Sequence, residues 1–127
     1  MTTFTNIFGG SNISPSEISY AEVSLTANTT YDWALETAPS ANLIAGIMDV
    51  TATAGPWSLT LPSALEASTG QAILFNNVGS ETFIIRNAAG VQVAAPVSGS
   101  VWQIYLTDNT TAGGTWQAFL YLSLIHI

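Results

Sequence analysis

The stretch GQAILFNNVGSETFIIRN, residues 70–87, decides the fold class of this chain. It holds an apolar run at Ala72–Phe75 and an alternating apolar–polar run at Thr82–Arg86, separated by the turn-forming residues Val78–Ser80. Short runs rich in Ile and Phe and bounded by Asn, Gly and Ser are typical of β-strands. Ala72–Phe75 is apolar at every position, which predicts a strand that is covered on both faces.

The same pattern recurs on both sides of this stretch, from Pro15 onward. Further short runs between turn signals are Ala21–Leu25, Thr29–Leu35, Ile44–Thr51, Trp57–Leu61, Val91–Val93, Val101–Leu106 and Thr115–Tyr121. Many evenly spaced short strands are typical of a sandwich or barrel, and no repeat of fixed period is evident. We therefore expect an all-β fold, a single antiparallel, jelly-roll-like β-sandwich of about nine short strands.

The alternation also predicts which side chains form the core. We expect six to be buried: Trp33, Leu59, Leu74, Ile85, Ile104 and Trp116. Core packing is the expected role of most of the four tryptophans, and Trp57, directly after Gly55-Pro56, is the one expected at the surface. The segment PSALEAS at 62–68 is the one plausible helical turn, and we expect it to be a loop that crosses between sheets.

Composition excludes several classes of function. Only 7 % of the 127 residues are charged, the net charge is −7, and Arg86 is the single Lys or Arg. Nucleic-acid binding needs several cations, so we expect no nucleic-acid partner. The acidic chain has no attraction for anionic membranes and no apolar stretch long enough to span a bilayer. Its first residues have neither a basic start nor an apolar run, so we expect no signal peptide. With no cysteine, it has no thiol chemistry.

No catalytic, cofactor-binding or metal-binding residue is assigned, and we expect a protein that is not an enzyme. The only histidine is His126, and no Ser–His–acid triad can be assembled around it. Eight acidic residues form many pairs, so the existence of a carboxylate pair is uninformative. Asp108–Thr111 is expected to be a hairpin loop rather than a calcium site, and the sequons at Asn12, Asn28 and Asn109 are expected to be turn residues.

Four segments carry a resemblance to a known group of proteins: residues 15–36, 57–64, 70–87 and 102–116. They resemble the N-terminal β-domain of tail-fibre-like and other virion structural proteins of tailed phages. The resemblance implies a virion protein made in the host cytoplasm. Its implied partners are other virion proteins and copies of itself, as a homotrimer or higher oligomer. It implies no cofactor and supplies no catalytic residue.

The two ends of the chain are expected to lie outside the β-domain at 15–121. Residues 1–14 are expected to form an extended arm, either a loose end or a segment that docks on a partner through Phe4, Ile7 and Phe8. The last residues, LSLIHI at 122–127, read as a translated transposase-adapter sequence from a sequencing library, with a native terminal strand as the alternative. The natural protein is then expected to continue beyond Tyr121.

Three functions follow in order of expectation. The first is a structural interaction module of a phage virion, the attachment or N-terminal domain of a tail-fibre-like protein. The second is a carbohydrate-binding β-sandwich that recognises host glycans, which a contiguous aromatic surface with polar groups around it would favour. The third is a fragment of a polysaccharide-degrading enzyme, which a cleft with two converging carboxylates would favour.

Overall fold

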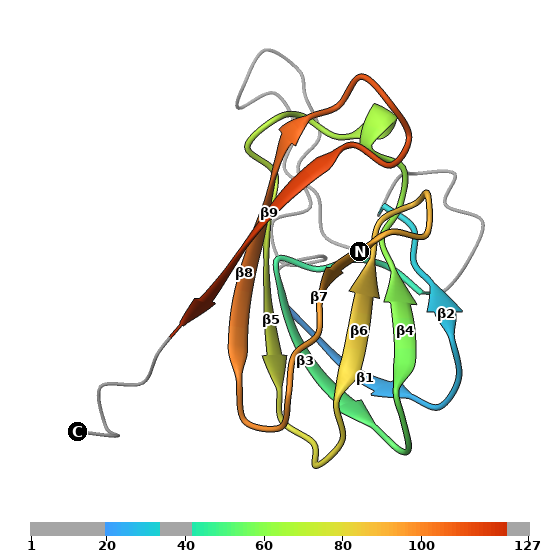
Figure 1. Ribbon diagram of the computed structural model, residues 1–127, viewed down its shortest axis with the longest axis vertical. Helices are drawn as coiled ribbons and strands as arrows, with labels where there is room; N and C mark the ends of the chain where they lie inside the picture. The colour runs from blue at the N-terminus through green and yellow to red at the C-terminus, as the bar shows by residue number, and fades with distance from the viewer. Residues whose placement is uncertain (1–19, 34–41, 122–127) are drawn as a thin grey trace, which may run out of the picture.

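The computed structural model describes residues 20–33 and 42–121, so the expected arm at 1–14 and the tail at 122–127 lie outside the described residues. Within these described residues, nine strands and one short 3₁₀-helix follow one another (Figure 1). They are β1 (Tyr20–Leu25), β2 (Thr29–Thr30), β3 (Ile47–Ala52), β4 (Trp57–Thr60), η1 (Ala64–Glu66), β5 (Ala72–Asn77), β6 (Phe83–Arg86), β7 (Gln92–Ala94), β8 (Val101–Asp108) and β9 (Thr115–Tyr121). The prediction of an all-β fold with about nine short strands is confirmed.

The strands form two sheets whose apolar faces meet. One is five-stranded with the order β1-β3-β5-β8-β9, and the other is four-stranded with the order β2-β4-β6-β7. Figure 1 shows the two layers side by side, with β8 and β9 on one flank and β2 on the other. From β1 to β6 the chain changes sheet after every strand, so each strand pairs with the strand two places along the sequence.

The prediction of a single antiparallel, jelly-roll-like sandwich was wrong, because both sheets are mixed. The pairs β1–β3, β3–β5, β2–β4 and β4–β6 are parallel. Only β5–β8, β6–β7 and β8–β9 are antiparallel. A chain that leaves one sheet, crosses the other and returns enters each sheet in the same direction every time. Strand direction therefore follows from this alternation.

The alternation winds the first half of the domain into coils whose length is equal in the five-stranded sheet and differs in the four-stranded sheet, where Thr29 pairs with Leu59 and Leu59 with Ile85. Tyr20 pairs with Ile47, and Ile47 pairs with Leu74, so positions 27 residues apart lie side by side twice in succession. The structure thus repeats although the sequence shows no fixed period. Backbone pairing depends on the number of residues in a coil and not on which side chains it carries, so a structural repeat needs no sequence repeat.

The core lies between the inner faces of the two sheets. Leu59, Ile85 and Ile104 are fully buried, as predicted. Leu74 is only half-buried, and its prediction was wrong: the inner positions of β5 are Ile73 and Phe75, so Leu74 faces outward. The expected cover on both faces of 72–75 is therefore incomplete.

The tryptophans lie around the edge of this core rather than inside it. Trp33 and Trp116 are half-buried, not buried as predicted, and their rings stack with centroids 6.5 Å apart. The Trp33 Nε1–H donates to the carbonyl oxygen of Ser63 at 2.7 Å. Trp57, expected at the surface, also packs against the core, and its Nε1 atom is buried with no hydrogen-bond partner. All four tryptophans therefore serve packing.

The 62–68 segment crosses from the four-stranded sheet to the five-stranded sheet, as expected, but it does contain a helical turn. Ser63 caps η1, because its side-chain oxygen accepts from the backbone N–H of Leu65 at 3.2 Å. Ala64 is buried against the β8–β9 turn, where Gly114 has a φ of +63°. A Cβ on Gly114 would lie 2.5 Å from the Ala64 Cβ, so only glycine fits there.

Asn77 is the one buried polar residue among the described residues, and it joins two connections at one end of the sandwich. Its Nδ2 donates to the carbonyl oxygens of Glu81 at 2.8 Å and Pro96 at 2.9 Å. Its Oδ1 accepts from the backbone N–H of Gly79 at 3.1 Å. All of its amide groups are thus engaged with backbone, which holds the β5–β6 and β7–β8 connections together.

Candidate functional site

The candidate site is the outer face of the five-stranded sheet, on the side away from the core. Strand pairing arranges its outward side chains in rows across the strands. One row is Tyr20, Ile47, Leu74, Gln103 and Phe119, and the next is Glu22, Asp49, Asn76, Val101 and Tyr121. Because every second residue of a strand points the same way, these rows form one continuous surface. We call it the outer face.

Large apolar side chains are concentrated on the outer face. Tyr20, Ile47, Phe119 and Tyr121 are each between 43 % and 56 % exposed. The rings of Tyr105 and Phe119 stack with their centroids 5.7 Å apart and an interplanar angle of 15°. The Tyr121 hydroxyl hydrogen-bonds to the Gln103 side chain. A contiguous patch of this kind, edged by polar groups, marks an interaction surface more often than a solvated one.

Apart from Asp108, which ends β8 beside Thr115, the half of the outer face formed by β5, β8 and β9 carries no acidic or basic side chain. Its outward residues are Ala72, Leu74, Asn76, Val101, Gln103, Tyr105, Thr107, Thr115, Gln117, Phe119 and Tyr121. In a chain with a net charge of −7, an uncharged surface of this size is distinctive. We call it the neutral half. Another molecule can cover it without burying a charge.

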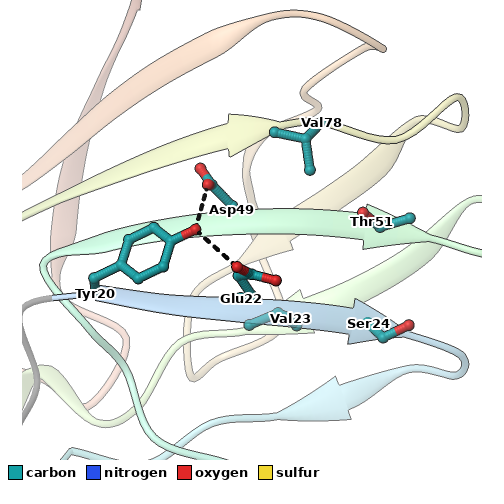
Figure 2. A pocket seen from close by; sticks show the side chains of 7 residues that line it. All are labelled: Tyr20, Glu22, Val23, Ser24, Asp49, Thr51 and Val78. Carbon is teal, nitrogen blue, oxygen red and sulfur yellow. Dashed lines mark hydrogen bonds between the residues drawn. The ribbon is translucent and has the colours of Figure 1, made fainter.

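The half formed by β1 and β3 carries an open, acidic hollow of about 610 Å³. It is lined by Tyr20, Glu22, Val23, Ser24, Asp49, Thr51 and Val78. Figure 2 shows the Tyr20 ring lying along β1 with its hydroxyl directed between the two carboxylates. This hydroxyl donates to Asp49 Oδ2 at 2.6 Å, and it lies 3.4 Å from Glu22 Oε1. The hydrogen bond to Asp49, with the nearby negative charge, raises the pKa of Tyr20 to about 12.

This hollow brings together two of the acids that the sequence left unpaired, but it lacks the surroundings of a glycosidase site. Glycosidases hold one carboxylic acid in an apolar pocket and keep the other ionised in a polar one. Here Glu22 is exposed, and both carboxylates face the same phenol in an open hollow. The arrangement suits recognition of a hydrogen-bond donor or a cation rather than acid–base chemistry.

The other candidate sites of the sequence form turns. Asp108 Oδ1 accepts from the backbone N–H of Thr110 at 2.8 Å and from its hydroxyl at 2.7 Å, which lowers the pKa of Asp108. Asn28 Oδ1 accepts from Ser58 N, and Asn109 Nδ2 donates to the Ala67 carbonyl oxygen. Asp108 thus has the predicted turn role, whereas Asn28 and Asn109 bind segments that lie 30 and 42 positions away. Asn12 and His126 lie outside the described residues.

The described residues contain neither a group of metal-binding side chains nor a membrane-spanning helix. In residues 20–33 and 42–121, no three His, Cys, Asp or Glu side chains are grouped so that they could hold a metal ion. No helix in that part of the chain is both long enough and apolar enough to cross a membrane.

The outer face was missed by the sequence reasoning, although its signal was present. The alternation in Thr115–Tyr121 assigned Trp116, Ala118 and Leu120 to the core, which leaves Phe119 and Tyr121 on the opposite side. Aromatic residues at positions expected to be solvated were the signal. Comparison with protein-family models, curated proteins and solved structures gave no match, so this surface is interpreted from its geometry alone.

Proposed function

We propose that this chain is a non-catalytic structural interaction module of a bacteriophage virion, the attachment or N-terminal domain of a tail-fibre-like protein. Its outer face is the contact surface, and its occupant is another copy of the chain. The virion assignment rests on the resemblance of segments 15–36, 57–64, 70–87 and 102–116. The contact assignment rests on the surface itself.

The observation that carries the proposal is the uncharged, aromatic neutral half. Two copies that each carry a net charge of −7 repel one another over most of their surfaces. The neutral half has its one charge at its end, on Asp108, and covering Phe119 and Tyr121 removes apolar area from water. Self-association through this surface therefore adds little charge repulsion and gains from the burial of apolar area.

The test is the oligomeric state of a variant with a charge in the neutral half. Phe119→Asp, at a residue that is 56 % exposed, is compared with Leu65→Asp on η1, at a residue that is 59 % exposed. We expect the parent and Leu65→Asp to self-associate in sedimentation velocity, and Phe119→Asp to sediment as a monomer with an unchanged melting temperature. A parent that stays monomeric at all concentrations, or a Phe119→Asp protein that assembles like the parent, rules out this contact.

A second function is favoured by one specific observation. The stacked rings of Tyr105 and Phe119 lie beside the amides of Gln103 and Gln117, an aromatic surface with polar groups around it. Aromatic rings flanked by amides also suit binding of a neutral host glycan. Screening the chain and Tyr105→Ala against a glycan library separates the functions, because only a glycan-binding module binds a defined sugar and loses it in this variant.

A further inference from the structure

Arg86, the only Lys or Arg of the chain, lies on the opposite side of the domain from the outer face. It ends β6 in the four-stranded sheet, where Ile85 points into the core and Arg86 points outward. Across the four-stranded sheet, Arg86 lies between Thr60 of β4 and Gln92 of β7, and Thr30 of β2 lies on the far side of Thr60. The single cation therefore stands on a surface of hydroxyl and amide groups.

Arg86 has no acidic partner in its own chain among the described residues. Its guanidinium donates one hydrogen bond, from Nη1 to the Gly90 carbonyl oxygen at 3.2 Å. A guanidinium has five N–H donors in a planar fork that matches a carboxylate, so most of its donors are left for another molecule.

The acidic hollow has the reverse character, because it holds acceptors and no cation. Glu22 and Asp49 lie on either side of the Tyr20 hydroxyl, which donates a short hydrogen bond to one oxygen of Asp49. The remaining carboxylate oxygens and the exposed Tyr20 ring face the open hollow (Figure 2). Carboxylates beside an aromatic ring are a favourable site for a guanidinium, through charged hydrogen bonds and contact with the ring.

We propose that the Arg86 side chain of a second copy docks in the hollow formed by Tyr20, Glu22 and Asp49. The inference rests on the proposed self-association and specifies its geometry. It places the outer surface of one copy's four-stranded sheet against the outer face of the next. Of all ways to bring two copies together, this one sets the single cation of the chain against a pair of acids.

The geometry makes the contact head-to-tail. The hollow and Arg86 lie on the outer surfaces of different sheets, so a copy that offers its hollow still has its arginine free for another neighbour. A contact between two different surfaces produces a ring when its rotation closes and a filament when it does not. A contact between two identical outer faces would instead stop at a dimer.

Single cysteines can detect this order of surfaces, because the natural chain has no cysteine. Thr51→Cys places one thiol in the lining of the hollow, and Thr60→Cys places one beside Arg86. Neither variant removes a charge. Each variant is treated with a short bis-maleimide on its own, and the two variants are also treated together as an equimolar mixture. A mixture of Thr51→Cys with Leu65→Cys measures the background of cross-links that form by random collision.

We expect covalent dimers above this background in the Thr51→Cys and Thr60→Cys mixture, and none above it in either variant alone. Adding Arg86→Glu to the Thr60→Cys protein should abolish the dimer. Adding Glu22→Lys to the other partner should then restore it, because the charges are exchanged across the contact. Glu22 is suited to this exchange since it is exposed, and melting temperatures check that each variant folds.

The other outcomes overturn the head-to-tail contact. Cross-linking of Thr51→Cys with itself shows that two outer faces meet, which leaves the proposed self-association standing. A mixed dimer that survives Arg86→Glu shows that the arginine has no part in the contact. If no sample cross-links while the parent still sediments as an oligomer sensitive to Phe119→Asp, only this inference fails. If the parent is also monomeric, the proposed function fails with it.

Discussion

Replacement of Asn77 tests whether one buried amide holds the β5–β6 and β7–β8 connections of the domain together. Asn77→Ala leaves the carbonyl oxygens of Glu81 and Pro96 and the N–H of Gly79 without the amide that now binds them. At about 1 kcal/mol of net stability for each hydrogen bond, and more where the orphaned group is buried, we expect a loss of about 3–5 kcal/mol in the free energy of unfolding. Urea denaturation followed by tryptophan fluorescence measures it.

A second variant at the same position adds a dependence on pH. Asn77→Asp directs carboxylate oxygens at two carbonyl oxygens in a fully buried place, so the pKa of the new acid is raised in the folded state. Its ionised form is the destabilising one. The variant should therefore lose stability, relative to the natural protein, as the pH rises above the unfolded value of about 4.

The matched control is Asn87→Ala, which removes an amide from an exposed turn. Asn87 Oδ1 accepts from the backbone N–H groups of Ala89 and Val91, each at 2.9 Å, where water can replace it. We expect a loss of about 1 kcal/mol or less. Equal losses for Asn77→Ala and Asn87→Ala would refute the reasoning. So would an Asn77→Asp protein whose relative stability does not change between about pH 3 and about pH 7, a range that contains the unfolded pKa of about 4.

Three further predictions concern the indole groups, the acidic hollow and the end of the chain. Trp33→Phe should cost about 1–2 kcal/mol in urea denaturation because a hydrogen bond to a carbonyl is lost, whereas Trp57→Phe should cost less, since it removes a buried N–H that has no partner. The phenol of Tyr20 should titrate near pH 12 by ultraviolet difference spectroscopy, and at lower pH in Asp49→Asn. Because the folded pKa of Tyr20 is raised from 10.0, the stability that this group contributes is present below pH 10 and is lost as the pH rises through about 12. Removal of Leu122–Ile127 should shift the free energy of unfolding by no more than about 1 kcal/mol, and a shorter chain that fails to fold would show that these residues belong to the domain.

The positions of the strands could be predicted from the sequence, because apolar alternation and turn residues act locally. Trp57–Leu61 and Val101–Leu106 were found within two residues of β4 and β8, and the inward side of each was correct at Leu59 and Ile104. The inward side of β5 was predicted wrongly, because Ala72–Phe75 is apolar on both faces and alternation cannot distinguish the two faces. Asn77, buried for its hydrogen bonds, is a residue that hydrophobicity assigns to the surface.

Strand direction and the candidate site could not be predicted, because both depend on pairings far apart in the chain. Alternation looks the same in a parallel and an antiparallel strand when one face is buried. Glu22 and Asp49 lie 27 positions apart, and only the register of β1 on β3 makes them neighbours. Each aromatic residue of the outer face could be identified in the sequence, but the surface that they form together appears only when β8 and β9 are placed beside β5.

The equal coil length in the five-stranded sheet bears on how such a domain can grow. A coil begins in one sheet, visits the other and returns one strand further along, and Tyr20, Ile47 and Leu74 mark three successive returns. An added segment of 27 residues between β3 and β5 would give each sheet one more parallel strand and leave the pairing of β5 with β8, and of β8 with β9, as it is. Each insertion would lengthen the stack by about 4.8 Å, the spacing of neighbouring strands. The domain therefore has the architecture of a modular spacer, in which duplication of a single coil changes reach without redesign of the closing hairpin.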